Sequence, residues 1–132
     1  MRKIMIVDDN YLSAEGIEKN IDWEVLNAEI VHICYNGTSA IDAMKKEPVD
    51  LIISDIEMPD LDGISMSRQA LDINPMVKII LISAYDKFEY ARRALLLGAL
   101  DYIEKPLDYA YLIQKVKNAF APVSYTHLTL PT

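Results

Sequence analysis

The chain has 132 residues, of which 52% are hydrophobic and 25% are charged, and its net charge is -7 at pH 7. This length suits one domain with a sizeable core, and the composition is typical of a globular protein rather than a disordered one. The negative charge argues against non-specific nucleic-acid binding by this chain itself. No apolar run reaches the length of about 18 residues that a membrane span needs, so we expect no membrane partner. The N-terminus is too short and too acidic for a signal peptide.

The cysteine and histidine content predicts no soft-metal site. Cys34 is the single cysteine and cannot form an internal disulfide. Its place in the apolar run 30–35 predicts an inert core thiol, which suits a reducing cytoplasm. His32 and His127 are far apart in sequence and lack ligand-like spacing.

Apolar runs typical of strands alternate with helical patterns along the whole chain. Five strand–helix units joined by right-handed crossovers predict a doubly wound α/β sandwich. The predicted elements, in chain order, are strand 3–7, helix 11–20, strand 29–35, helix 40–47, strand 50–54, helix 63–73, strand 78–82, helix 87–97, strand 101–104 and a last helix that Asp108 caps and that runs through residue 120.

Local residues mark where helices begin and end. Thr38 or Ser39 is the predicted N-cap of the helix over 40–47, and Pro48 ends that helix. Gly98 is the predicted C-cap of the helix over 87–97.

Polar side chains stand where four of the predicted strands end. Asp8 and Asp9 follow the first strand, Asp55 follows the third, Ser83 the fourth and Lys105 the fifth. In an open parallel sheet, ligands gather outside the carboxyl ends of the strands. The fold would therefore bring three carboxylates, one hydroxyl and one ammonium to one rim. Such a set predicts a magnesium and phosphoryl site.

These residues and the turns beside them resemble the receiver domain of bacterial two-component response regulators. Each motif alone is weak, but together they follow successive strands in the right order. The resemblance covers residues 1–121 and implies a flavodoxin-like (βα)5 fold with a parallel sheet in the order 2-1-3-4-5. The motifs are the Asp8-Asp9 pair, Asp55 with Met58-Pro59 and Asp62-Gly63 after it, Ser83-Ala84, and Lys105-Pro106.

The resemblance implies a bound Mg²⁺ and names its ligands. Asp9 and Asp55 bind the ion directly, Asp8 binds it directly or through water, and the backbone carbonyl of Glu57 adds a ligand. Physical chemistry agrees, because carboxylates a few ångströms apart repel by roughly 4 kcal/mol per pair at an intermediate dielectric. A hard cation with oxygen ligands would offset that repulsion.

The resemblance also implies a phosphoryl transfer from a sensor histidine kinase. Asp55 is the phosphoacceptor, whose carboxylate attacks the phosphoryl group to give an acyl phosphate. Lys105 pairs with Asp55 and then with a phosphoryl oxygen, and the hydroxyl of Ser83 donates to another oxygen. The Lys105-Pro106 peptide is cis in this family. The expected role is a signalling domain that at most catalyses its own phosphorylation and dephosphorylation.

A switch accompanies phosphorylation in this family. Tyr102, which the residues alone predict to be half-buried strand packing, turns inward when Ser83 moves. The face built by the helix over 87–97, the strand over 101–104 and the last helix then changes. We expect this face to form a homodimer or to release an output domain. Trp23 is predicted to pack at the end of the first helix.

Two segments, 83–91 and 21–23, resemble receivers that precede an AraC-type helix-turn-helix domain. That output domain is not in this chain, so DNA contact is expected only through the missing part. Residues 123–132 match the translation of a sequencing adapter, so the stretch 122–132 is predicted to be a non-native, unstructured tail. A natural disordered terminus is the alternative.

Two other functional classes remain open. Asp55-Ile56-Glu57 loosely resembles the D-x-D motif of haloacid-dehalogenase-like phosphohydrolases. Those enzymes carry the nucleophile after the first strand, and they need a larger chain with a cap. A degenerate receiver that only docks partners usually lacks an acid, the hydroxyl or the lysine, and all of them are present here.

Overall fold

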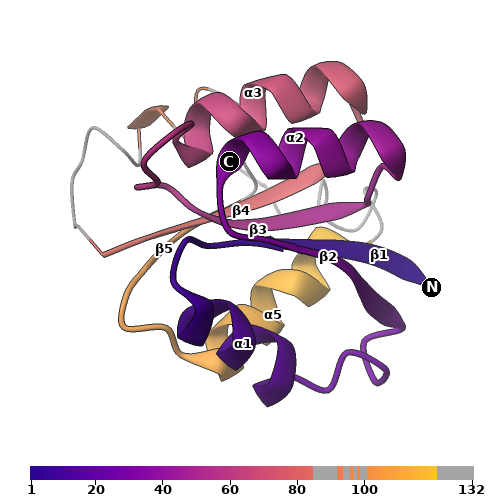
Figure 1. Ribbon diagram of the computed structural model, residues 1–132. Helices are drawn as coiled ribbons and strands as arrows, with labels where there is room; N and C mark the ends of the chain where they lie inside the picture. Colours follow the sequence, from indigo (N-terminus) through magenta and orange to yellow (C-terminus); the bar gives the residue numbers. More distant parts are fainter. Residues whose placement is uncertain (85–91, 94–95, 97, 99–100, 122–132) are drawn as a thin grey trace, which may run out of the picture.

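The computed structural model describes residues 1–84, 92–93, 96, 98 and 101–121. These residues form a five-stranded parallel sheet in the order β2-β1-β3-β4-β5, with helices on both faces (Figure 1). The predicted flavodoxin-like fold and strand order are confirmed. The strands are β1 Arg2–Val7, β2 Ala28–Cys34, β3 Leu51–Asp55, β4 Lys78–Ser83 and β5 Asp101–Glu104.

Two helices cover each face of the sheet in the described part of the chain. α1 (Tyr11–Asn20) and α5 (Tyr109–Ala119) lie on one face, and α2 (Gly37–Lys46) and α3 (Gly63–Ile73) lie on the other (Figure 1). The helix predicted over 87–97 lies mostly outside the described residues, as does the tail over 122–132. None of the helices described could cross a membrane, because none is long and apolar enough.

The start of α2 corrects the sequence prediction. Asn36, rather than Thr38 or Ser39, is the N-cap, and its side chain accepts a hydrogen bond from the N–H of Ser39 at 2.8 Å. Asn caps a helix as well as Ser or Thr does, but an Asn-Gly pair is also typical of a turn, which conceals its capping role in the sequence. Gly37 is needed as the first helical residue, because a Cβ there would collide with the carbonyl oxygen of Leu61.

The other helix ends follow the prediction more closely. Asp108 caps α5 and accepts hydrogen bonds from the N–H groups of Ala110 and Tyr111. Gly98 has φ of 99°, the left-handed conformation that suits a residue after a helix. The predicted capping role of Asp108 is therefore confirmed, and the backbone of Gly98 agrees with its predicted role.

The sheet is buried on both faces because successive residues of its strands point to opposite sides. In β1, Met5 belongs to the apolar cluster under α2 and α3, whereas Ile4 and Ile6 belong to the cluster over α1 and α5. Cys34 is buried in the first cluster, and Trp23 is buried in the second, where its Nε1 donates to the carbonyl oxygen of Ile17 at 3.3 Å. Both predicted core positions are confirmed, and the packed sheet gives the strand ends a fixed frame.

Candidate phosphoacceptor and metal site

Three carboxylates meet at the C-terminal ends of two adjacent strands. Asp8 and Asp9 follow β1, and Asp55 is the last residue of β3, which pairs with β1 in parallel. Each of the three offers an oxygen that lies within 4.8 Å of the others. The predicted acidic cluster therefore forms, at a spacing that suits oxygen ligands around one shared cation.

Burial and mutual repulsion disfavour the ionised forms of the two buried carboxylates, Asp8 and Asp55. Asp8 and Asp55 are only 4% and 7% exposed, whereas Asp9 is open to solvent. Burial, followed by the neighbouring Asp8 carboxylate, raises the pKa of Asp55 to about 6, against the opposing effect of Lys105. Burial likewise raises the pKa of Asp8. A bound divalent cation would favour the ionised form of both groups.

The ammonium of Lys105 lies on the other side of Asp55. Its Nζ is 3.4 Å from Oδ2 of Asp55, while Oδ1 accepts a hydrogen bond from the N–H of Ile56 at 3.0 Å. The N–H of Lys105 donates to the carbonyl oxygen of Ser83 at 2.8 Å, which ties the ends of β4 and β5 together. The peptide between Lys105 and Pro106 is cis, as the resemblance implies. The structure thus brings the predicted ammonium to the predicted nucleophile.

Ser83 ends β4 beside this site and is fully buried. Its hydroxyl lies 3.2 Å from Oε1 and 3.3 Å from Oε2 of Glu57. The sequence prediction gave Glu57 a role through its backbone carbonyl alone, so the contact of its carboxylate was missed. An acid two residues after Asp55 was the signal available, but nothing in the sequence separates such a residue from a solvated loop acid.

The backbone beyond Asp55 is held close to the strand ends. The N–H of Ile56 donates to the carbonyl oxygen of Ile82 at 3.0 Å, and the N–H of Gly63 donates to the carbonyl oxygen of Ile56 at 2.8 Å. A Cβ at Gly63 would collide with the carbonyl oxygen of Asp55. Asp62 caps α3 through the N–H of Ser65 at 2.8 Å. The Asp62-Gly63 motif therefore lets α3 begin directly against the end of β3.

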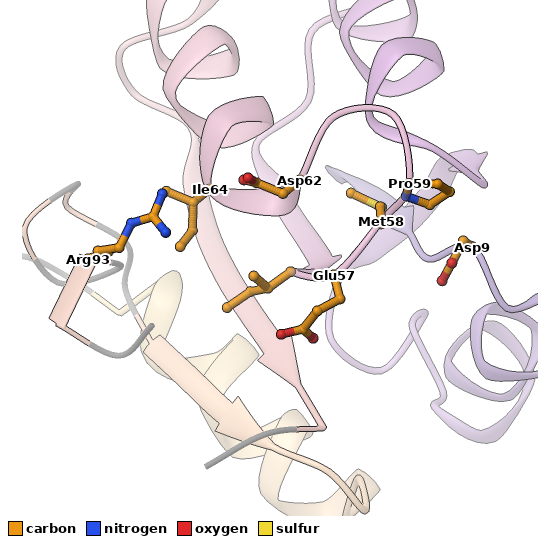
Figure 2. A pocket seen from close by; sticks show the side chains of 8 residues that line it. Asp9, Glu57, Met58, Pro59, Asp62, Ile64 and Arg93 are labelled. Atoms are coloured by element: carbon orange, nitrogen blue, oxygen red, sulfur yellow. The ribbon is translucent and has the colours of Figure 1, made fainter. Parts of the chain in front are cut away.

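A pocket of about 480 Å³ opens beside the carboxylates. Figure 2 shows Glu57 between Asp9 on one side and Arg93 on the other. The pocket gives solvent access to Asp9 and to the loop that follows Asp55. Its lining residues are Asp9, Ile56, Glu57, Met58, Pro59, Asp62, Ile64 and Arg93.

Comparison with known proteins decides the family. Residues 4–117 match the model of the response regulator receiver domain. The chain belongs to this family. Within a receiver domain, the place of Asp55 at the end of β3 differs from the first-strand nucleophile of the phosphohydrolase alternative.

The relatives of this receiver domain include transcriptional response regulators. The regulatory protein YesN of Bacillus subtilis is 29% identical over 121 residues, which are 92% of this chain and 33% of YesN. The regulatory protein ZraR of Salmonella typhimurium is 33% identical over 129 residues, which are 98% of this chain and 29% of ZraR. The receiver domain thus spans about a third of the length of these relatives.

Solved receiver structures share the fold closely. The receiver domain of AraT, a response regulator from Geobacillus stearothermophilus, superposes with a TM-score of 0.84 at 34% identity, covering 89% of this chain and 92% of that one. A two-component transcriptional regulator AraC from Clostridium phytofermentans gives 0.81 at 30% identity, covering 98% and 99%. A CheX-CheY-BeF3-Mg complex from Borrelia burgdorferi gives 0.80 at 27% identity, covering 92% and 90%.

Tyr102 lies on β5, where receiver domains carry the switch residue implied by the resemblance. It is half-buried, pairs with Leu81 of β4 and packs against the cluster under α2 and α3. The prediction of half-buried strand packing is confirmed. Its role as a switch stays a prediction.

Proposed function

We propose that this receiver domain, over residues 1–121, accepts one phosphoryl group on Asp55 from a sensor histidine kinase in a Mg²⁺-dependent reaction. The observation that carries the proposal is the position of Asp55 between a pair of carboxylates and an ammonium group. On one side, oxygens of Asp8 and Asp9 lie within 4.8 Å of an oxygen of Asp55, and on the other side Nζ of Lys105 lies 3.4 Å from Oδ2.

The donor set fits Mg²⁺, which prefers hard oxygen ligands and keeps several waters. We assign Asp9 and Asp55 as direct ligands, Asp8 as a ligand directly or through water, and the backbone carbonyl of Glu57 as a further ligand. When bound, Mg²⁺ would neutralise the crowded carboxylates and the incoming phosphoryl oxygens. The similarity to a chain that was solved with BeF3 and Mg supports this assignment.

The residues of the chain itself bind and orient the transferred group. The ionised carboxylate of Asp55 attacks phosphorus, the bond from phosphorus to the donor nitrogen breaks, and an acyl phosphate forms. Lys105, which donates a hydrogen bond to Oδ2 of Asp55, would move that bond to a phosphoryl oxygen. The hydroxyl of Ser83 would donate a hydrogen bond to another phosphoryl oxygen. Preorganised donors of this kind stabilise charge as it develops.

We further propose that phosphorylation switches the face formed by the helix over 87–97, β5 and α5. A phosphoryl group adds about -1.5 to -2 charge, which would draw Ser83 and Lys105 towards it and let Tyr102 turn inward. If this face has an inactive and an active conformation, shifting the equilibrium from mostly inactive to mostly active needs about 5.5 kcal/mol of differential stabilisation. A few hydrogen bonds to a charged group, at about 1.5–3 kcal/mol each, supply that amount.

The output controlled by this face is proposed to be transcription. The regulatory names of the similar proteins and the 30% identity to the Clostridium AraC regulator support an AraC-type DNA-binding domain in the longer protein. Self-association through the switched face and release of that domain are the two routes that we consider.

Incubation with a small phosphodonor and Mg²⁺, followed by mass spectrometry, tests the proposal. We expect one added phosphoryl group, lost in Asp55→Asn and in the presence of a chelator. Asp42→Asn, which changes an exposed acid on α2, is the matched control and should be labelled normally. Labelling that survives Asp55→Asn would overturn the assignment of Asp55.

A further inference from the structure

Asp60 lies in the loop between β3 and α3, five residues after Asp55, and contacts the start of α2. Its Oδ1 accepts a hydrogen bond from the N–H of Gly37 at 3.3 Å, and its Oδ2 accepts one from the N–H of Thr38 at 3.1 Å. A hydrogen bond from the Thr38 side chain, together with bonds from backbone N–H groups that include those of Thr38 and Gly37, lowers the pKa of Asp60 to about 2, although the residue is exposed. Asp60 is therefore ionised at any physiological pH.

The first N–H groups of a helix lack partners within the helix, and negative charge is favourable there. At the start of α2 these N–H groups donate hydrogen bonds to two side chains from different parts of the chain. The side chain of Asn36, the N-cap, accepts a hydrogen bond from the N–H of Ser39. The carboxylate of Asp60 accepts hydrogen bonds from the N–H groups of Gly37 and Thr38. Both side chains cap the helix, but Asp60 also ties a distant loop to it.

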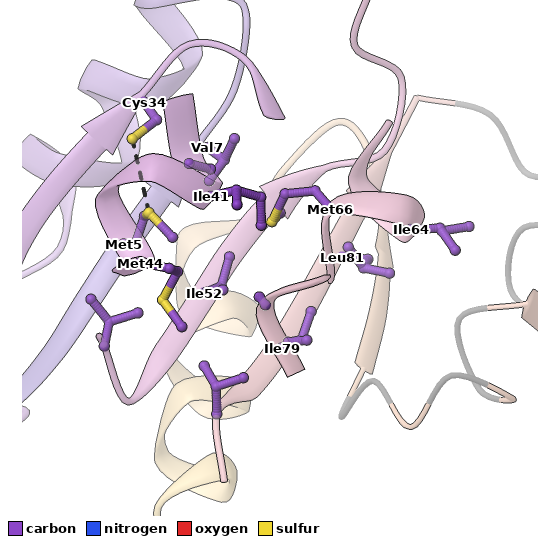
Figure 3. Packing of buried hydrophobic residues seen from close by; sticks show 14 of the residues in the cluster. Met5, Val7, Cys34, Ile41, Met44, Ile52, Ile64, Met66, Ile79 and Leu81 are labelled. Atoms are coloured by element: carbon purple, nitrogen blue, oxygen red, sulfur yellow. Dashed lines mark hydrogen bonds between the residues drawn. The ribbon is translucent and has the colours of Figure 1, made fainter. Parts of the chain in front are cut away.

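The helix that Asp60 contacts is itself fixed against the sheet. Ile41 and Met44 of α2 are buried in one cluster with Met5 and Ile52 of the central strands (Figure 3). The backbone of the loop also touches α2, since the space beside Gly37 is filled by the carbonyl group of Leu61. The hydrogen bonds of Asp60 therefore anchor the loop to a helix that is packed on the sheet, rather than to another loop.

The tied loop is the one that carries the proposed metal ligand. The N–H of Gly63 donates to the carbonyl oxygen of Ile56, and this bond joins the two ends of the loop. Along the chain, Glu57 lies between Ile56, which accepts that bond, and Asp60, which contacts α2. The hydrogen bonds of Asp60 thus restrict the same stretch of backbone, 57–61, that must present the Glu57 carbonyl to Mg²⁺.

We propose that Asp60 is a positioning residue of the phosphoacceptor site, which fixes the loop over 57–61 by capping α2 from outside that helix. It is not itself a ligand. The inference rests on the function proposed above, because it requires Mg²⁺ binding at the Glu57 carbonyl. It adds a residue that the motifs of the family resemblance do not contain.

The pair Asp60→Ala and Asn36→Ala tests the proposal. Each substitution removes a cap from the same helix end, but Asp60→Ala alone releases the loop. Mg²⁺ affinity is measured by calorimetry without any phosphodonor, and Tm and amide exchange of residues 57–61 are measured in parallel. We expect both variants to lower Tm. Asp60→Ala alone should weaken Mg²⁺ binding, by roughly ten-fold, the lower end of what partners outside the ligand set contribute.

Asp60→Asn keeps an acceptor oxygen for the N–H of Thr38 and should recover most of the Mg²⁺ affinity. If the alanine variant does not fold, Asp60→Ser, which loses both carboxylate oxygens but keeps a polar side chain, replaces it in the same comparison. Equal loss of affinity in Asp60→Ala and Asn36→Ala would reduce Asp60 to a stabiliser of α2 and overturn the proposal. Unchanged affinity in Asp60→Ala and Asp60→Asn would overturn it too, while the proposed function stands. A wild-type chain that binds no Mg²⁺ and accepts no phosphoryl group would instead overturn the proposed function, and this inference with it.

Discussion

The hydroxyl of Ser83 is held by Glu57: the oxygen lies 3.2 and 3.3 Å from the two oxygens of the Glu57 carboxylate. A serine hydroxyl has one proton to donate. If Ser83 donates that proton to a phosphoryl oxygen, as proposed, it must withdraw it from Glu57. The carboxylate of Glu57 and the phosphoryl group therefore compete for one donor.

Glu57→Ala should increase the affinity for the phosphoryl mimic beryllofluoride, by roughly three- to ten-fold. A hydrogen bond to a charged group contributes about 1.5–3 kcal/mol, and partial exposure of Glu57 reduces that value here. The backbone carbonyl, and so the proposed metal ligand, is kept. Fluoride titration at fixed beryllium and Mg²⁺ measures the change. Glu57→Gln separates loss of charge from loss of the acceptor, and weaker binding in both variants would contradict the competition.

Asp9→Ala should weaken Mg²⁺ binding by at least roughly ten-fold with little effect on folding. The residue is exposed, so its removal leaves no cavity, but it supplies one of the three clustered carboxylates. Direct ligands contribute at least as much as the partners that orient them. Calorimetric titration provides the measurement, with Asp72→Ala as the control, because Asp72 is an exposed acid on α3. Equal affinities in the two variants would remove Asp9 from the ligand set.

The metal-free protein should become less stable as the pH rises from about 4 to about 7. The pKa of Asp55 is about 6 in the folded chain against 3.8 for the unperturbed group, and the pKa of Asp8 is raised as well. Between these values the folded state binds more protons than the unfolded state, so the free energy of unfolding falls with increasing pH. Urea unfolding in a chelator at several pH values measures this slope. Asp55→Asn should flatten it and should stabilise the metal-free protein at pH 7 by about 1–2 kcal/mol.

Excess Mg²⁺ should also flatten this pH dependence, because binding to the folded state alone stabilises it. A stability that rises through the same pH range in the chelator would contradict the raised pKa values of Asp55 and Asp8.

Gly63→Ala should destabilise the fold by about 1–3 kcal/mol, the usual range for overpacking. The new Cβ would meet the backbone of Asp55, which cannot yield without moving the proposed phosphoacceptor. Gly16→Ala is the matched control, because its Cβ would meet the terminal hydroxyl of Tyr109, which can turn away. Thermal unfolding and phosphorylation rate are the measurements. A Gly63→Ala variant as active and stable as Gly16→Ala would show that the close approach at Asp55 has no consequence.

Beryllofluoride with Mg²⁺ should change the amide signals of residues 101–111 as well as those around Asp55. The expected cause is the movement of Ser83 and Lys105, which are joined through their backbones at 2.8 Å, together with inward rotation of Tyr102. NMR shift mapping measures the response, and Tyr102→Ala is the variant that should break it beyond β5. Changes confined to the loops at Asp55 would mean that the domain accepts a phosphoryl group without transmitting it.

The sequence predicted the rim residues because periodicity locates strand ends. Apolar runs place Asp8, Asp55, Ser83 and Lys105 at the ends of parallel strands, and parallel pairing brings such ends to one edge. Their proximity could therefore be predicted without knowing the conformation of any loop. The same reasoning located α1, α3 and α5 closely, since each follows a clear helical pattern or capping residue.

The missed contacts belong to loops, which have no such period. Glu57 meets Ser83 across 26 positions of sequence, and Asp60 meets Gly37 across 23. A carboxylate in a polar loop gives the same sequence signal whether it is solvated or bonded. The N-cap of α2 was misplaced for a related reason, because several residues that can cap a helix stand in a row at 36–39 and only the backbone conformation selects Asn36.

The strand order also divides the site into two halves. β3 is the central strand, so Asp55 has β1, with the acidic pair, on one side and β4 and β5, with Ser83 and Lys105, on the other. The half that would hold the proposed cation and the half that would carry the signal outward share Asp55 but come from opposite sides of the sheet. We therefore expect substitutions near β1 to alter the preference for the ion while the response along β4 and β5 is kept. We expect the reverse for substitutions near β4 and β5, so that the two properties would vary independently.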